Sequence, residues 1–214
     1  MKIVSLNIGL PSTRRYEGRE VVTGGAKKPV PVAVLRFENF DGDLQADRVN
    51  HGGTEKAVCV YPFDHYPYWG RKLGVDLEPG AFSENLTVSG ATEAEVCVGD
   101  VFRIGKAIVQ VSQPRMPCAK LAGKHASKLL PKLAASTGYT GFYMRVLSEG
   151  PVAAGDGLDL LRAHPDRITI GDVNSIIYGK SHDIALIERL AELPEFSEVG
   201  RTLFARRLER LTRE

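Results

Sequence analysis

The sequence predicts a mainly β protein with inserted short helices and a small C-terminal appendage of three helices. Short β-branched runs separated by glycine and proline fill the first 165 residues, a pattern typical of barrels and sandwiches. Helical periodicity replaces this pattern in the rest of the chain. A chain of 214 residues, of which 43% are hydrophobic, is long enough for one substantial core plus an appendage. We therefore expect a β domain over residues 1–165 and a helical extension over residues 166–214.

Six runs in the β domain have the composition of strands. They are KIVSLNI (2–8), VPVAVLRF (30–37), KAVCVY (56–61), ENLTVSG (84–90), KAIVQVSQ (106–113) and GFYMRVL (141–147). Turn signals such as DGD (41–43) and VGD (98–100) separate them. In the fifth run, residues at odd positions and residues at even positions are expected to face opposite sides of a sheet.

Helical periodicity within the β domain occurs in FDHYPYWGRKLG (63–74) and in AKLAGKHASKLLPKLAA (119–135). Proline lacks the N–H that a helix interior needs, so Pro131 is expected to kink or end the second helix. His65, Tyr66 and Trp69 in the first helix could line a pocket, although such a cluster on a short helix is more often part of a core.

Three short helices are expected in the C-terminal extension. Thr169 and Asp172 have the spacing of a helix start and Gly179 that of a stop, which predicts a helix over 170–178. Ser181 is the expected N-cap of a second helix within SHDIALIERLAELP (181–194), and SEVGRTLFARRLERL (197–211) is the third. The apolar residues expected on the inner faces of these two helices are Ile184, Ile187, Leu190, Val199, Leu203, Leu208 and Leu211.

The charge balance argues against a nucleic-acid or membrane partner. The chain has 28 Lys and Arg residues against 26 Asp and Glu, and glutamates interrupt the arginines of the last helix, as on a solvated face. Neither the N-terminal stretch nor any later apolar run has the length of a signal peptide or a membrane span. Three cysteines far apart argue against a disulfide framework and fit a reducing compartment. The expected location is the cytoplasm.

Cys118 is the candidate reactive thiol. It follows a Pro-Arg-Met-Pro turn that contains Arg115, precedes Lys120, and lies where a helix is expected to begin. Positive charge and the N-terminal end of a helix both favour the thiolate, which can act as a nucleophile or as a soft metal ligand. Cys59 and Cys97 lie among apolar strand residues, and we assign both to packing.

A second candidate group surrounds a pair of glycines. His51, Gly52, Gly53 and Thr54 can form a tight loop whose backbone N–H groups converge on a phosphate, and Lys56 would add positive charge. The spacing is not that of a Walker motif, and a Gly-Gly pair alone is more often a turn. Asn85 could be a turn or strand-entry residue, or it could direct its amide at a ligand.

Taken together, these motifs resemble the MOSC family, which is named for the C-terminal region of molybdenum cofactor sulfurases. The resemblance lies in the ordered series D-x-x-x-D-R-V-N-H-G-G-x-x-K-A-V-x-x-Y (from Asp43), F-x-E-N-L, V-G-D-x-F-R-I-G and Q-P-R-x-P-C-x-K-L. The tail beginning ITIGDVN is similar to the three-helix extension of the YiiM-like branch. The resemblance therefore covers nearly the whole chain and implies a MOSC-type β-barrel with that extension.

The resemblance also implies a site. The family's invariant cysteine falls on Cys118, which would be the catalytic residue and a ligand of molybdenum in a molybdenum-pterin cofactor. A thiolate suits this soft, sulfur-rich metal centre. The loop of residues 51–54 would hold the cofactor's phosphate, and Asn85 would hydrogen-bond the phosphate or the pterin. The full set of residues expected to bind the cofactor is Arg48, His51, Gly52, Gly53, Thr54, Lys56, Asn85, Gln113, Arg115 and Lys120.

The function implied by the resemblance is the reduction of N-hydroxylated compounds, such as hydroxylaminopurine-type base analogues. The sequence has no flavin, nicotinamide or iron–sulfur motif, so electrons are expected from a separate reductase. The helical tail could dock this partner, close the pocket or form a homodimer contact. Two alternatives remain. Cys118 could carry a persulfide in a sulfur carrier, which would receive its sulfur from elsewhere because the chain has no pyridoxal-phosphate domain, or the protein could store the cofactor without catalysis.

Overall fold

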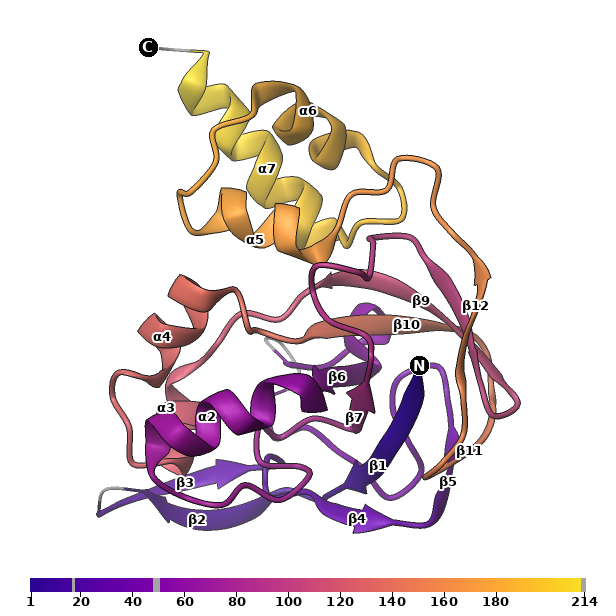
Figure 1. The fold of residues 1–214 in the computed structure, drawn as a ribbon, viewed down its shortest axis with the longest axis vertical. Coiled ribbons are helices and arrows are strands. Elements are labelled where there is room, and N and C mark those ends of the chain that lie inside the picture. The colour runs from indigo at the N-terminus through magenta and orange to yellow at the C-terminus, as the bar shows by residue number, and fades with distance from the viewer. Residues whose placement is uncertain (17, 48–50, 213–214) are drawn as a thin grey trace.

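The computed structural model describes residues 1–16, 18–47 and 51–212, and its largest element is an eight-stranded sheet (Figure 1). The strands of this sheet are β1 (Lys2–Ile8), β4 (Lys28–Val30), β6 (Val58–Pro62), β7 (Leu86–Ser89), β8 (Val101–Ile104), β9 (Ala107–Pro114), β10 (Phe142–Ser148) and β12 (Leu158–Arg162). Their order is β12–β8–β9–β10–β6–β7–β1–β4, with β6 and β7 parallel. Two smaller sheets pair β2 (Ser12–Tyr16) with β3 (Arg19–Thr23) and β5 (Val32–Leu35) with β11 (Gly150–Ala153).

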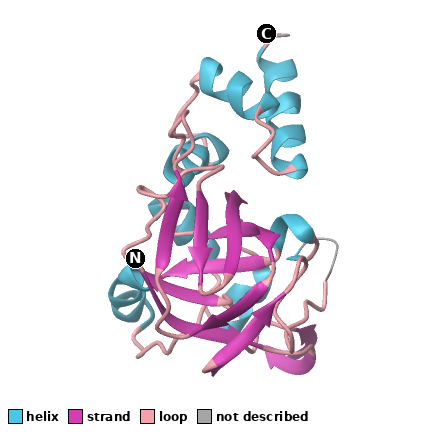
Figure 2. Ribbon diagram, turned by 90° about the vertical axis from the view of Figure 1, so that its right-hand side faces the viewer, coloured by secondary structure: helices cyan, strands magenta, loops and turns pink. Residues whose placement is uncertain are grey.

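The large sheet curls until its ends approach each other. The Ile3 amide donates to Asp156 O at 2.9 Å and the Leu158 amide donates to Met1 O at 3.1 Å, which joins β1 to the start of β12. Figure 2 shows the strands crossing in two directions around the interior. The mainly β fold with inserted helices is therefore confirmed. The ladder is not a closed barrel over the described residues, because β12 and β4 remain its outer strands.

Every run expected to be a strand overlaps one, and the first run matches β1 at both ends. Strands β6, β9 and β10 each extend one residue beyond the predicted run. The run over 30–37 contains the last residue of β4 and all of β5, which are separated by Pro31, a residue that cannot donate to a ladder. Strands β2, β3, β8, β11 and β12 are absent from the sequence prediction. They are short, and most carry charged side chains that obscure the apolar alternation.

The helices of the β domain occupy the two expected places. They are α2 (Tyr66–Leu73), which follows the 3-10 turn η2 (Phe63–His65), α3 (Ala119–Lys124) and α4 (Leu130–Thr137). The expectation for Pro131 is wrong, because α3 already ends at Lys124 and Pro131 lies in the first turn of α4. Proline is tolerated there, since first-turn N–H groups have no acceptor within the helix.

The side chains of α2 contribute to an aromatic core. Tyr66 and Trp69 are buried with Tyr61 and Phe82, and the Trp69 indole N–H donates to the Tyr61 hydroxyl at 2.6 Å. His65 is also buried, and its ring makes an edge contact with the ring of Tyr61. The core interpretation of these residues is therefore correct, and the cluster lies behind α3.

Three helices form the tail, as expected: α5 (Ile170–Ile177), α6 (Ile184–Glu192) and α7 (Glu198–Leu211). Thr169 and Asp172 form a capping box at the start of α5, and Gly179 adopts a φ of 72° just beyond its end. The N-cap of α6 is Asp183 instead of Ser181, because the helix begins later than expected and Asp183 Oδ1 accepts from the Leu186 amide at 3.0 Å.

The inner faces of α6 and α7 differ in part from the expectation. Ile187 and Leu190 are buried and Leu208 and Leu211 pack against the core, whereas Ile184, Val199 and Leu203 are exposed. The buried positions of α7 are Gly200 and Phe204, one turn apart. A Cβ at position 200 would lie 2.5 Å from the Phe196 ring, so this glycine allows close packing and fixes the rotation of α7.

One apolar core continues from the sheet into the tail. Ile170, Val173, Phe196 and Phe204 belong to the same buried cluster as the strand residues. Figures 1 and 2 place the three helices together at one end of the sheet. The division of the chain at residue 165 stays a prediction. In the part of the chain that is described, no helix is long and apolar enough to cross a membrane.

Candidate active site around Cys118

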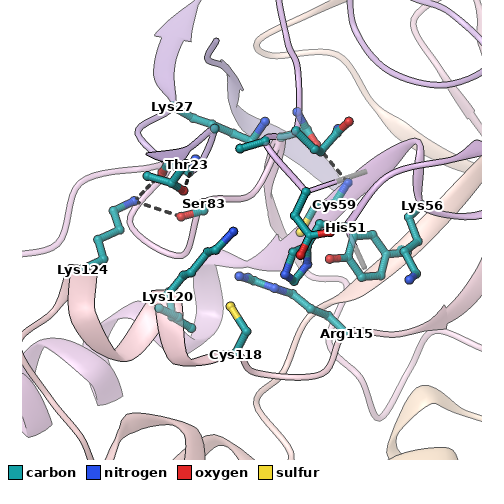
Figure 3. Close-up of a pocket in the computed structure, with 18 of the residues that line it drawn as sticks. Thr23, Lys27, His51, Lys56, Cys59, Ser83, Arg115, Cys118, Lys120 and Lys124 are labelled. Carbon is teal, nitrogen blue, oxygen red and sulfur yellow. Dashed lines mark hydrogen bonds between the residues drawn. The ribbon is translucent and has the colours of Figure 1, made fainter. Parts of the chain in front are cut away.

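A cleft of about 700 Å³, including its open mouth, lies between the β2–β3 hairpin, α3 and the neighbouring strands of the sheet (Figure 3). Its walls come from this hairpin, the segments 24–27 and 45–47, β6, β10 and α3. The cationic side chains that line it are Lys27, Lys56, Arg115, Lys120 and Lys124, with His51 beside them. Among the described lining residues, Asp47 is the acidic one. The cleft is therefore suited to an anion.

The cleft brings together many of the residues expected at the site. Those that line it are Cys118, His51, Lys56, Asn85, Arg115 and Lys120. Gly52, Gly53, Thr54 and Gln113 are described but are not among its lining residues. Arg48 lies outside the described residues. The residues that meet come from distant segments of the chain, so the fold assembles a site from motifs that are separate in sequence.

Cys118 is the N-cap of α3, and its extended backbone directs the thiol into the cleft (Figure 3). Partial burial is the largest influence on this thiol and raises its pKa. Other groups outweigh this effect of burial and lower the pKa to about 7. They are the His51 side chain and the Leu121 backbone N–H, which both form hydrogen bonds with the thiol, and the positive charge of Arg115. A thiol with this pKa is substantially ionised at neutral pH. His51, expected to bind phosphate, thus also stabilises the thiolate.

Arg115 is a buried cation with an unused donor. Arg115 is only 7% exposed, and its Nη1 has no hydrogen-bond partner among the described residues. Burial opposes its charge, but nearby Cys59, Tyr143 and Cys118 raise the pKa of the guanidinium, which stays protonated. A buried, unpaired donor is costly, so Nη1 calls for an acceptor such as an ordered water molecule or a bound anion.

Two further lysines, which the sequence analysis does not predict, line the cleft and contact other groups of the protein. Lys124 donates to Gly25 O at 3.0 Å and to Gly80 O at 2.7 Å, and burial lowers its pKa to about 8. Lys27 forms an ion pair with Asp43. The spacing of Lys120 and Lys124, four residues apart on one helix, is a signal that could have indicated Lys124. No local pattern indicates Lys27.

Asn85 lines the cleft but uses its amide within the protein. Its Oδ1 accepts from the Cys59 amide at 3.1 Å, and its Nδ2 donates to Asp43 Oδ2 at 2.9 Å and to Asn7 O at 3.3 Å. The side chain is 2% exposed. Asn85 therefore ties β6, β7 and β1 together behind the cleft, which is the strand-entry role that the sequence left open.

The glycine loop leads into the 3-10 turn η1 (Thr54–Lys56). Gly53 precedes this turn with a φ of 89°, a left-handed conformation that favours glycine, and its carbonyl accepts from the Lys56 amide at 2.9 Å. Gln113, on β9, is buried beside the Pro-Arg-Met-Pro turn, and its Oε1 has no partner in the described part of the chain.

The remaining cysteines differ in position. Cys59 lies on β6 and lines the cleft, although it is only 7% exposed, and burial raises the pKa of its thiol. Cys97 is fully buried away from the cleft, and burial likewise raises its pKa. Cys118 is therefore the acidic thiol of the three. The described residues contain no cluster of three or more His, Cys, Asp or Glu side chains that could hold a metal ion.

Known families match the chain along most of its length. A MOSC domain model matches residues 47–159, more than half of the chain, and a model of the YiiM-like, 3-alpha helix domain matches residues 168–211. The chain belongs to the MOSC-domain family. The resemblance to the YiiM-like branch is thereby confirmed, and MOSC domains as a class are associated with the molybdenum cofactor.

Individual relatives agree with the MOSC assignment. The chain is 49% identical over 210 residues to YflK of Bacillus subtilis, which covers 98% of this chain and 95% of YflK. It is 33% identical over 157 residues to a Gibberella moniliformis protein named reductase, a match that covers 72% of this chain and 28% of that longer protein. The crystal structure of YiiM from Geobacillus stearothermophilus matches with a TM-score of 0.83 at 38% identity, over 97% of this chain and 98% of that one.

The cleft of this MOSC domain fits a molybdenum-pterin cofactor on two observations. The cofactor is an anion, and the cleft is lined by an excess of cations, among them the buried Arg115, whose Nη1 has no hydrogen-bond partner among the described residues. Its metal is soft, and Cys118 offers an ionisable thiol on the same surface. Cys118, Arg115, His51, Lys56 and Lys120 are the residues that could hold such a group.

Proposed function

We propose that the cleft binds a molybdenum-pterin cofactor through Cys118 and that the protein reduces N-hydroxylated compounds with electrons from a separate reductase. The observation that carries this proposal is a buried guanidinium with an unused donor, Arg115, beside an acidic thiol, Cys118. The family's association with the cofactor supports the ligand, and the fungal relative named reductase supports the reaction class. Reduction of R–NH–OH to R–NH₂ and water consumes two electrons and two protons.

Each residue of the cleft has a separate part in this proposal. Cys118 binds the metal as thiolate, and His51 holds that thiolate by donating a hydrogen bond to Sγ. Arg115 donates from Nη1 to the anionic cofactor and supplies a charge that burial from water strengthens. Lys120 and Lys56 balance further negative charge. When bound, the cofactor supplies a metal centre able to exchange two electrons with an N–O bond.

The experiment is to produce the protein in a host that makes the cofactor and to measure molybdenum and pterin per chain. Turnover of a hydroxylaminopurine with an artificial reductant is then followed for the wild type and for Cys118→Ser. We expect near-stoichiometric molybdenum and turnover in the wild type, and no turnover in the folded variant. Bound molybdenum without turnover of any N-hydroxylated compound would leave the storage function and exclude the reductase.

A sulfur carrier is the second candidate, and the acidity of Cys118 favours it too, because persulfide transfer also requires a thiolate on an open surface. Mass spectrometry of the purified protein separates the two. A mass increase of one sulfur atom on the peptide that contains Cys118, without molybdenum, would support the carrier. Stoichiometric molybdenum and pterin with an unmodified cysteine would support the reductase.

A further inference from the structure

The turn η1 delivers Lys56 to the cleft and connects His51 to β6, yet little within the turn holds it in place. It is three residues long, none of its residues is buried, and its N-cap Gly53 makes no side-chain cap. A single 3-10 turn is too short to be stable by itself. The position of this wall of the cleft must therefore be set by contacts from elsewhere in the protein.

Among the described residues, two side chains of the sheet form hydrogen bonds with Glu55 in η1. The hydroxyl of Ser112, on β9, lies 2.6 Å from Glu55 O and 3.1 Å from Tyr143 O, so these two acceptors share its one proton and the shorter contact is the one to Glu55. Ser112 is fully buried. Arg145, on β10, donates from Nη2 to Glu55 Oε2 at 2.5 Å and from Nη1 to Gln110 Oε1 at 3.1 Å. The backbone and the side chain of Glu55 are thus both anchored, by residues that do not line the cleft.

The same serine is held by the helical tail. The backbone N–H of Ser197, the N-cap of α7, donates to Ser112 O at 3.0 Å. Ser197 is fully buried, and Phe196 beside it belongs to the common core. A continuous path of two hydrogen bonds therefore leads from the tail through Ser112 to Glu55. Neither serine lines the cleft.

We propose that Ser112 is a positioning residue through which the three-helix tail holds η1, and with it the cleft wall that carries Lys56 and His51. The tail then acts as a support of the site, a role distinct from docking a partner. The inference rests on the hydrogen bonds around η1 and is independent of which ligand the cleft binds.

The first test uses hydrogen exchange of the cofactor-free full-length protein, read by mass spectrometry on peptides that cover residues 51–58. Ser112→Ala removes the bond to Glu55 O, and we expect exchange in these peptides to become about tenfold faster, the effect of losing one hydrogen bond. Ser112→Thr retains a hydroxyl and is expected to restore slow exchange. Ser5→Ala is the matched control, because Ser5 is also buried in the sheet and its hydroxyl donates to Asn7 Oδ1 at 2.8 Å instead of to a residue of η1.

The second test isolates the link to the tail. Ser197→Pro removes the backbone N–H at a φ of −60°, which proline can adopt, whereas Ser197→Ala removes the α7 cap and retains the N–H. We expect faster exchange over residues 51–58 in the proline variant alone. Equal exchange in these two folded variants, or no difference between Ser112→Ala and Ser5→Ala, would overturn the proposal. If Ser197→Pro does not fold, Phe204→Ala takes its place, because Phe204 is buried against Phe196 and its loss loosens the start of α7. Unchanged exchange over residues 51–58 in that folded variant would overturn the link to the tail.

Discussion

Replacing His51 with leucine tests the electrostatics of the cleft. The variant removes the hydrogen bond from His51 to Cys118 and any positive charge on the imidazole, two of the causes that lower the pKa of the thiol to about 7. If all the lowering causes were lost, burial would remain and the pKa would rise above its ordinary value of 9.0, so the thiolate fraction at pH 7 would fall from roughly a half to roughly 1% or less. Because the Leu121 N–H and Arg115 remain, we expect a smaller fall, of about five- to twentyfold.

The assay is the rate of alkylation of Cys118 by iodoacetamide between pH 5.5 and 10, resolved by peptide mass spectrometry. Only the thiolate reacts, so the rate rises as pH passes through the pKa of the thiol. The midpoint is expected near pH 7 in the wild type and at higher pH in His51→Leu. Cys59 and Cys97 serve as internal references, since burial raises the pKa of both thiols and shields them.

Lys120→Leu is the matched control, because it removes a cation that lines the same cleft while leaving the hydrogen bond from His51 to the thiol intact. Its midpoint is expected to move less than that of His51→Leu. An unchanged profile in His51→Leu would refute the reasoning, and a larger shift in Lys120→Leu would assign the acidity to charge instead of the hydrogen bond.

Three other predictions follow from the same geometry. Cys118→Ser is expected to fold but lose reductase turnover, and full turnover in this variant would contradict the catalytic role of the thiol. Cys59→Ser and Cys97→Ser are instead expected to lower the free energy of unfolding, measured in urea, by about 1–3 kcal/mol. Gly53→Val forces a β-branched residue into a φ of 89° and is expected to reduce molybdenum per chain, so undiminished content would place the phosphate elsewhere. Lys124 has a folded-state pKa of about 8, below its ordinary value of 10.5, so it makes the free energy of unfolding rise between those pH values. Lys124→Met should therefore show a smaller rise than the wild type between pH 7.5 and 9.5, and an equal rise would contradict the assignment.

Local patterns were sufficient for much of the fold. The capping box at Thr169 and Asp172 involves residues three apart, and the apolar run of β1 has a complete strand pattern, so both are legible in sequence. The inner face of α7 is not legible in the sequence, because the rotation of this helix is set by Phe196 packing against Gly200. The β2–β3 hairpin was missed because the charged residues Arg14, Arg15, Arg19 and Glu20 interrupt the apolar pattern of its short strands.

Some residues of the candidate site are predictable from the sequence, whereas the contacts between distant segments are not. The motif around Cys118 indicates a reactive thiol, and Arg115 belongs to the same turn, so the sequence predicts both. The hydrogen bond from His51 to that thiol and the pairing of Lys27 with Asp43 join segments that only the fold brings together. The sequence gives no sign that Nη1 of Arg115 lacks a partner, since this depends on which groups the fold packs around the guanidinium.

The most direct test of the central claim, that the Cys118 thiolate binds the metal, is molybdenum K-edge X-ray absorption on the purified wild-type protein and on Cys118→Ser. The spectrum reports the number of sulfur atoms bound to molybdenum. We predict one sulfur neighbour fewer in the serine variant, at unchanged pterin content. The same sulfur count in both proteins would contradict the account, because the thiol would then lie in the cleft without binding the metal.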